Sequence, residues 1–166
     1  PLVIAGGSSV DDPWTVNATP IGTAPIFPNF RRGQSFTAPS TGNITAVALR
    51  IQTSTSTASF RVDVVDGGDF QGATLGSTIF TFNAIVLQGP VVSELDQPVA
   101  VTQGSSYFLR VTQLSGSIDL VWEPTDTYAG GQAYFSSDNT TWIAQGVGDF
   151  LFGLRMSGAD ALNVDL

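Results

Sequence analysis

Aromatic and polar side chains gather in one stretch of this 166-residue chain, from Trp122 to Trp142. The stretch also holds Tyr128 and Tyr134, and carboxylates and amides are interleaved with the four rings. A sugar ring has an apolar C–H face and a rim of hydroxyls, so a sugar site needs a flat aromatic surface edged by hydrogen-bonding groups. The stretch supplies both kinds of group and predicts a sugar-binding site in the last third of the chain.

Two kinds of contact with a sugar are expected, stacking by aromatic rings and hydrogen bonding by polar side chains. Trp122 and Tyr128 are expected to stack on sugar rings, while Glu123, Asp126 and Gln132 are expected to bind the hydroxyls. The alternative is a structural role, because Trp and Tyr also pack well in strands and cores. Glycoside hydrolysis needs two carboxyl groups facing one cleft, and nothing beyond the Glu123–Asp126 pair suggests such a cleft. No enzymatic activity and no catalytic residue are therefore expected.

The segment S-S-D-N-T-T-W over residues 136–142 is similar to an Asp-box hairpin. In such a turn an Asp side chain caps backbone N–H groups and a Trp packs beneath. The segment is one residue short and lacks the usual Gly. We expect Asp138 and Trp142 to be structural, and Tyr134 to pack inward or to form a hydroxyl corner.

Acidic residues cluster in V-D-V-V-D-G-G-D-F, where Asp66 and Asp69 flank two glycines. Carboxylates at such positions can converge with backbone carbonyls on calcium, so a structural calcium ion is the predicted cofactor. The EF-hand spacing is absent, and the alternative is a solvated turn. Strand pairing is expected to set Asp63 against Arg50 or Arg110.

The charge balance excludes several classes of function. Fourteen acidic residues against six basic ones give a net charge of -8, and the chain has no His and no Cys. A Ser–His–Asp or Cys–His nucleophile and a His- or thiolate-ligated metal are therefore excluded. An anionic chain whose cations are all Arg is not expected to bind nucleic acid, and no apolar run is long enough for membrane insertion. Arg31–Arg32 could clamp a carboxylate or an acidic sugar, or pair with a nearby Asp.

The elements that must position these residues are strands, because apolar side chains recur with a period of two between Gly, Pro, Ser and Asn punctuation. The predicted strands are 34–38, 44–51, 60–64, 75–82, 91–95, 99–102, 107–111, 118–123, 133–136, 141–145 and 150–156. About ten short strands indicate an all-β fold, an antiparallel β-sandwich of the jelly-roll type. Residues 1–157 are expected to form one domain in which 13–33 are a long loop, and 158–166 to be a linker or tail.

The chain resembles a known family over roughly residues 30–156. The shared segments are Q-S-F-T at 34–37, I-T-A-V-A-L-R at 44–50, R-V-D-V-V-D-G-G at 61–68, S-Y-F-L-R-V at 106–111 and G-D-F-L-F-G-L-R at 148–155. They are similar to bacterial extracellular jelly-roll domains of the choice-of-anchor type, which resemble carbohydrate-binding modules in architecture. The resemblance implies a jelly roll at the cell surface or outside the cell, beside neighbouring domains of a larger chain.

The sequence is compatible with three functions. The first is a non-catalytic carbohydrate-binding module of a secreted or surface bacterial protein, with a polysaccharide or cell-surface glycan as its partner. The second is a structural or adhesive module of a large surface protein with no small ligand, in which the rings are all buried. A receptor-binding jelly roll of a phage or virus is a third reading and predicts a trimer.

Overall fold

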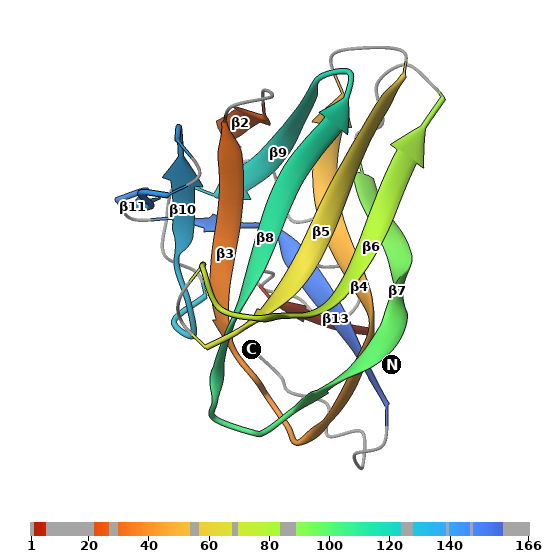
Figure 1. Cartoon of the computed structure of the whole chain (residues 1–166), viewed down its shortest axis with the longest axis vertical. Coiled ribbons are helices and arrows are strands. Elements are labelled where there is room, and N and C mark those ends of the chain that lie inside the picture. Colours follow the sequence, from red (N-terminus) through yellow and green to blue (C-terminus); the bar gives the residue numbers. More distant parts are fainter. Residues whose placement is uncertain are drawn as a thin grey trace.

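The fold is an all-β sandwich, as the sequence predicts. The computed structural model describes residues 2–5, 22–26, 30–53, 57–67, 70–83, 89–123, 128–138, 140–146 and 148–157. These residues form two antiparallel sheets that pack face to face around one core (Figure 1). Within these ranges no helix is long and apolar enough to cross a membrane.

One sheet has six strands and the other seven. The six-stranded sheet runs in the order β11 (Ile143–Ala144), β10 (Ala133–Ser136), β3 (Arg31–Thr37), β8 (Ser106–Ser115), β5 (Ala58–Asp66) and β6 (Thr74–Phe82). The seven-stranded sheet runs β1 (Leu2–Ala5), β13 (Phe152–Ser157), β4 (Gly42–Thr53), β9 (Ile118–Glu123) and β12 (Asp149–Phe150), with β7 (Gly89–Val101) also on β4 and β2 (Gly22–Ile26) also on β9. Successive strands lie in different sheets at eight connections, β2–β3, β3–β4, β4–β5, β6–β7, β7–β8, β8–β9, β9–β10 and β11–β12, and the run from β2 to β9 follows the order of a jelly roll.

The period of two places the core as predicted. Phe60, Val62 and Val64 on β5 point between the sheets and are fully buried, and Leu109 on β8 is buried beside them. The largest buried side chains of the core come from both sheets, and they include Phe36, Phe60, Phe150, Phe152, Leu49, Ile51 and Leu120. Two layers of alternating strands that share such a core need no disulfide or metal at this length.

The expected loop over residues 13–33 is wrong in its second half. Residues 22–26 form strand β2, and β3 begins at Arg31. Pro25 lies opposite Asp119 of β9, and among the described residues β9 is the single partner of β2. A strand with one partner tolerates Pro, because the missing N–H would have faced away from the ladder. Residues 13–21 and 158–166 lie outside the described ranges.

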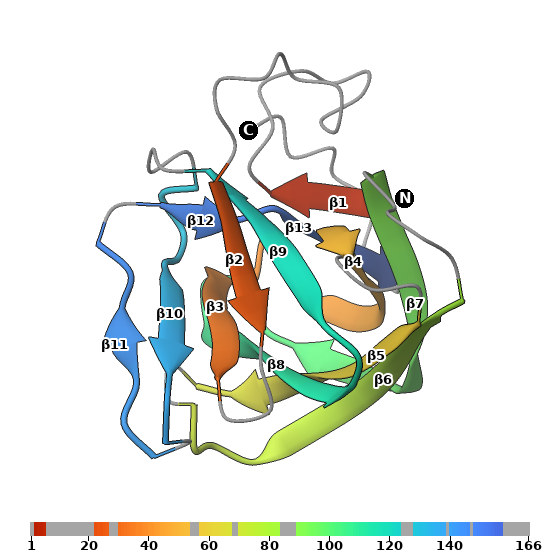
Figure 2. The same ribbon diagram turned by 90° about the horizontal axis from the view of Figure 1, so that it is seen from above.

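Strand β7 closes one side of the sandwich beside β6, as the view from above shows (Figure 2). The sequence predicts two strands here, but one strand bends through residues 95–98, where its pairing to β4 shifts register. In this bend the Asp96 side chain accepts a hydrogen bond of 2.8 Å from the Ser77 N–H of β6. Covering the edge in this way protects β6 from pairing with another chain.

Candidate functional site

The candidate site lies on the outer face of the six-stranded sheet, the face turned away from the core. Strand register sets five residues side by side across this face: Tyr134 on β10, Gly33 on β3, Arg110 on β8, Asp63 on β5 and Ser77 on β6. We call these five residues the first row. The connection from β5 to β6 crosses in front of β8 and β3 (Figure 1). Its Phe70 contacts the first row, through the Tyr134 ring and through a hydrogen bond from Arg110 to the Phe70 carbonyl oxygen.

Four aromatic rings meet at the β10 end of the first row. Phe70, carried by the β5–β6 connection, stacks on Trp142 with ring centroids 4.4 Å apart and an angle of 9° between the planes. Phe70 also contacts Phe108 and Tyr134 edge to face, with distances between ring centroids of 3.8 and 4.6 Å. A Cβ atom on Gly33 would lie 2.1 Å from the Phe108 ring, so glycine makes room for that ring. We call Phe70, Phe108, Tyr134 and Trp142 the outer aromatic cluster.

The turn that carries Trp142 is built as the sequence predicts. Oδ1 of Asp138 accepts hydrogen bonds from the backbone N–H groups of Thr140 and Thr141, at 2.8 and 2.7 Å. These two N–H groups hold the pKa of the Asp138 carboxyl far below its usual range. The Gln71 side chain donates to the carbonyl oxygen of Thr140, which ties the β5–β6 connection to this turn. Trp142 is therefore fixed from two sides while its side chain stays partly exposed.

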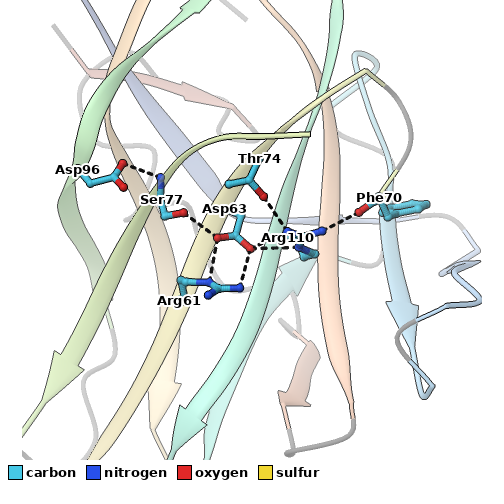
Figure 3. Close-up of polar contacts among 7 residues, drawn as sticks. All are labelled: Arg61, Asp63, Phe70, Thr74, Ser77, Asp96 and Arg110. Carbon is cyan, nitrogen blue, oxygen red and sulfur yellow. Dashed lines mark hydrogen bonds and ion pairs between the residues drawn. The ribbon is translucent and has the colours of Figure 1, made fainter. Parts of the chain in front are cut away.

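A buried carboxylate holds the β5–β6 connection in place (Figure 3). Asp63 is 1% exposed, and its carboxylate pairs with Arg110 at 2.9 Å and with Arg61 at 2.9 Å. Arg110 in turn donates to the Phe70 carbonyl oxygen and to the Thr74 hydroxyl, both at 2.9 Å. The predicted pairing of Asp63 with Arg110 is confirmed, and through it the ion pair supports the ring on which Trp142 stacks.

Arg31 and Arg32 serve different faces of β3. Arg31 is half-buried on the outer face, whereas Arg32 is 6% exposed and points between the sheets. The Arg32 guanidinium lies 4.7 Å from the centre of the Phe30 ring and donates to the Gln145 side chain at 2.9 Å. Burial lowers the pKa of Arg32 to about 10, and Asp119 opposes that shift, so Arg32 stays charged at neutral pH. Arg32 is thus a structural cation.

Tyr128 corrects one of the expected sugar contacts. Its side chain is 9% exposed and packs edge to face on Phe152, with ring centroids 5.4 Å apart. The hydroxyl accepts from the Thr37 N–H and donates to the Thr37 carbonyl oxygen, both at 3.1 Å, and burial raises its pKa. The segment can lie this close to β3 because Gly131 has no Cβ, which would lie 1.8 Å from the Ser35 carbonyl oxygen. A ring held inside in this way cannot stack on a sugar.

The other expected sugar contacts do not meet on one exposed surface within the described residues. Trp122 follows the inward positions of β9 and packs half-buried against the core. Gln132 is half-buried and its side chain donates to the Gly146 carbonyl oxygen at 2.6 Å. Glu123 pairs through its backbone with Asp149, while its side chain and all of Asp126 lie outside the described residues.

The predicted calcium ligands are only partly described. Asp66 is exposed at the end of β5, and its N–H donates to the Ala73 carbonyl oxygen at 3.0 Å, which closes the base of the β5–β6 connection. Asp69 lies outside the described residues. Among the residues that are described, no three acidic side chains gather as a metal site would require. Calcium therefore stays a prediction.

The site contains residues that sequence reasoning missed, above all Phe70, Phe108 and Arg61. The sequence held a signal for Phe108. It lies on the same side of strand 107–112 as Arg110 and Thr112, and a large apolar ring on such a polar side is usually covered by another part of the protein. Tyr134, expected to face inward or to form a hydroxyl corner, lies instead in the outer aromatic cluster. No protein-family model matches this chain, and no curated protein matches it.

Proposed function

We propose that this chain is a non-catalytic carbohydrate-binding module of a secreted or cell-surface bacterial protein, and that it binds a polysaccharide or cell-surface glycan. The observation that carries the proposal is Trp142, a partly exposed indole on a rigid support. Stacking on Phe70 and the Asp138-capped turn orient the indole before any ligand arrives. A preorganised ring loses little entropy on binding, which favours affinity for a flat sugar face.

Polar groups suited to sugar hydroxyls surround this indole. Gln71, Thr140 and Thr141 are exposed beside Trp142, and their amide and hydroxyl groups both donate and accept hydrogen bonds. The proposed contact surface thus moves from Trp122 and Tyr128 to the turn at residues 136–142. A structural calcium ion bound through Asp66 and Asp69 remains part of the proposal, and equal melting temperatures with and without chelator would remove it.

One observation favours the second candidate, a structural or adhesive module with no small ligand. Phe108 is fully buried under Phe70, so the outer aromatic cluster also acts as a small hydrophobic core that anchors the β5–β6 connection. If that is its whole role, Trp142 stabilises the fold and no glycan binds. The two candidates therefore predict different results when polysaccharide is added: a binding module contacts the glycan through Trp142, whereas in a structural module Trp142 contacts no glycan.

Affinity electrophoresis through gels that contain single polysaccharides separates the two candidates. We expect the chain to be retarded by at least one glycan and Trp142→Ala to weaken that binding about tenfold or more, as for a central aromatic contact. Ile143→Ala is the matched control, because Ile143 is 51% exposed, adjacent in sequence and outside the outer aromatic cluster. Free migration through every gel, with Trp fluorescence unchanged by each glycan, would support the structural module instead.

A further inference from the structure

A second row of side chains crosses the outer face next to the first row. Strand register pairs Ser136 on β10 with Arg31 on β3, and Thr112 on β8 with Arg61 on β5, which in turn pairs with Ile79 on β6. The β3–β8 register places Arg31 beside Thr112, so that Arg31 and Arg61 flank this threonine. We call these five residues the arginine row. Two strand spacings of about 4.8 Å separate the two arginine backbones, a distance of about 10 Å.

Three arginines and two carboxylates lie at or beside the arginine row, and one of the carboxylates, Asp138, accepts a hydrogen bond from the Ser136 hydroxyl at one end of the row. Arg31, Arg61 and Arg110 share Asp63 as the carboxylate close to them, and Asp63 is already paired with Arg61 and Arg110. Within the described residues the Arg31 guanidinium makes no hydrogen bond or ion pair. Arg31, Arg61 and Arg110 are three of the six arginines in the chain, and all three lie on the outer face of the six-stranded sheet, although the net charge of the chain is -8.

The surroundings of Arg31 favour an added anion. Burial lowers its pKa most, the charges of Arg110 and Arg61 lower it further, and Asp63 opposes them. The Thr112 hydroxyl oxygen, on the strand between those of Arg31 and Arg61, is buried, and no hydrogen-bond partner for it lies among the described residues. An anion seated here would relieve the repulsion between the cations and also give that hydroxyl an acceptor.

The arginine row is open to a large ligand. Arg61 is 43% exposed, and Ile79 beside it is 57% exposed. Leu114, two residues after Thr112 on the same strand face, is 50% exposed. The first row, with Tyr134 at one end, lies directly alongside, so that a chain of sugars could contact both the rings and the arginines.

We propose that the glycan recognised on this face is acidic, a polysaccharide whose carboxylate groups bind Arg31 and Arg61 while its sugar rings lie on Trp142 and Tyr134. This inference rests on the proposed carbohydrate-binding function and names its ligand class. A guanidinium matches a carboxylate with two parallel N–H···O bonds, whereas it matches a neutral hydroxyl with one. The overall negative charge of the chain then opposes binding elsewhere and confines an acidic polymer to this face.

The test measures binding of polygalacturonate, its methyl ester, a sulfated polysaccharide and a neutral glucan by titration calorimetry. We expect polygalacturonate to bind, and the methyl ester, with the same sugar but no charge, to bind about tenfold more weakly. Arg31→Gln and Arg61→Gln should each reduce polygalacturonate affinity about fivefold to tenfold, and added salt should weaken binding by the unaltered chain. Arg155→Gln is the matched control, since Arg155 is 38% exposed and lies on the other sheet.

Each contrary outcome has a distinct meaning. Equal binding of polygalacturonate and its methyl ester, or no effect of the two arginine variants, overturns the acidic-ligand inference and leaves the carbohydrate-binding function intact. Tighter binding of the sulfated polymer than of polygalacturonate overturns the choice of carboxylate. Binding of no polysaccharide overturns both proposals, and concentration-dependent dimers that the arginine variants abolish would then assign the arginine row to a protein interface.

Discussion

Removing the charge of Asp63 tests the central support of the candidate site. Asp63→Asn keeps the side-chain shape but leaves Arg61 and Arg110 without their carboxylate, and Ser77 now faces a neutral group. Removing one partner of a buried ion pair costs about 3–5 kcal/mol. Because Arg61 is 43% and Arg110 17% exposed, water partly solvates the orphaned cations. Solvent screening makes the loss smaller than for a fully buried pair. We therefore expect the free energy of unfolding to fall by about 2–4 kcal/mol.

Thermal unfolding followed by circular dichroism measures this loss. A domain of this length loses about 2–4 °C in melting temperature for each kcal/mol, so Asp63→Asn should unfold roughly 5–15 °C earlier. The Trp emission of the folded variant, to which Trp142 contributes, should also shift to the red, because Arg110 no longer holds the Phe70 carbonyl as firmly.

The exposed pair of Glu94 with Arg155 provides the control. Glu94 is 64% exposed, so Glu94→Gln should cost under about 1 kcal/mol and leave the Trp emission unchanged. If Asp63→Asn and Glu94→Gln lower the melting temperature equally, the buried ion pair does not support the site and the reasoning given for it is refuted.

Two further predictions concern the sequence segment around the site. Tyr128→Phe removes a hydroxyl that both donates to and accepts from the Thr37 backbone, and chemical denaturation should show a loss of about 1–2 kcal/mol while glycan binding stays unchanged. Weaker glycan binding by Tyr128→Phe would contradict the assignment of Tyr128 to the interior, because it would mean that the ligand contacts this residue. The lowered pKa of Asp138 stabilises the fold at pH values above about 4, where the unfolded carboxyl is ionised, and this stabilisation is lost as the pH falls further. The difference in melting temperature between the unaltered chain and Asp138→Asn should therefore shrink below pH 4, and a constant difference would contradict the capping role.

Local pattern determined much of this protein. The sequence predicted strands at β4, β5, β6, β8 and β9, and for β4, β5 and β8 the alternation of apolar and polar side chains also predicted the side that faces the core, because a period of two is a property of the strand itself. The turn at residues 136–142 was also readable, since Asp138 bonds to N–H groups only two and three residues away. The Asp63–Arg110 pair needed one correct strand pairing, and the sequence predicted it only as one of two choices.

Only the tertiary structure decided which rings face water. Trp122 and Tyr128 were expected to be exposed because polar residues surround them in sequence, yet Trp122 packs half-buried against the core, and Tyr128 is buried with its hydroxyl on the Thr37 backbone. Trp142 lies outside because Phe70, carried by a connection with no periodic pattern, folds over Phe108 and supports it. The arginine row likewise joins residues 31, 61 and 112, which are far apart in the chain and are brought together by strand register alone. Periodicity states which side of a strand is apolar, but long-range pairing decides which strands are neighbours and which loop covers them.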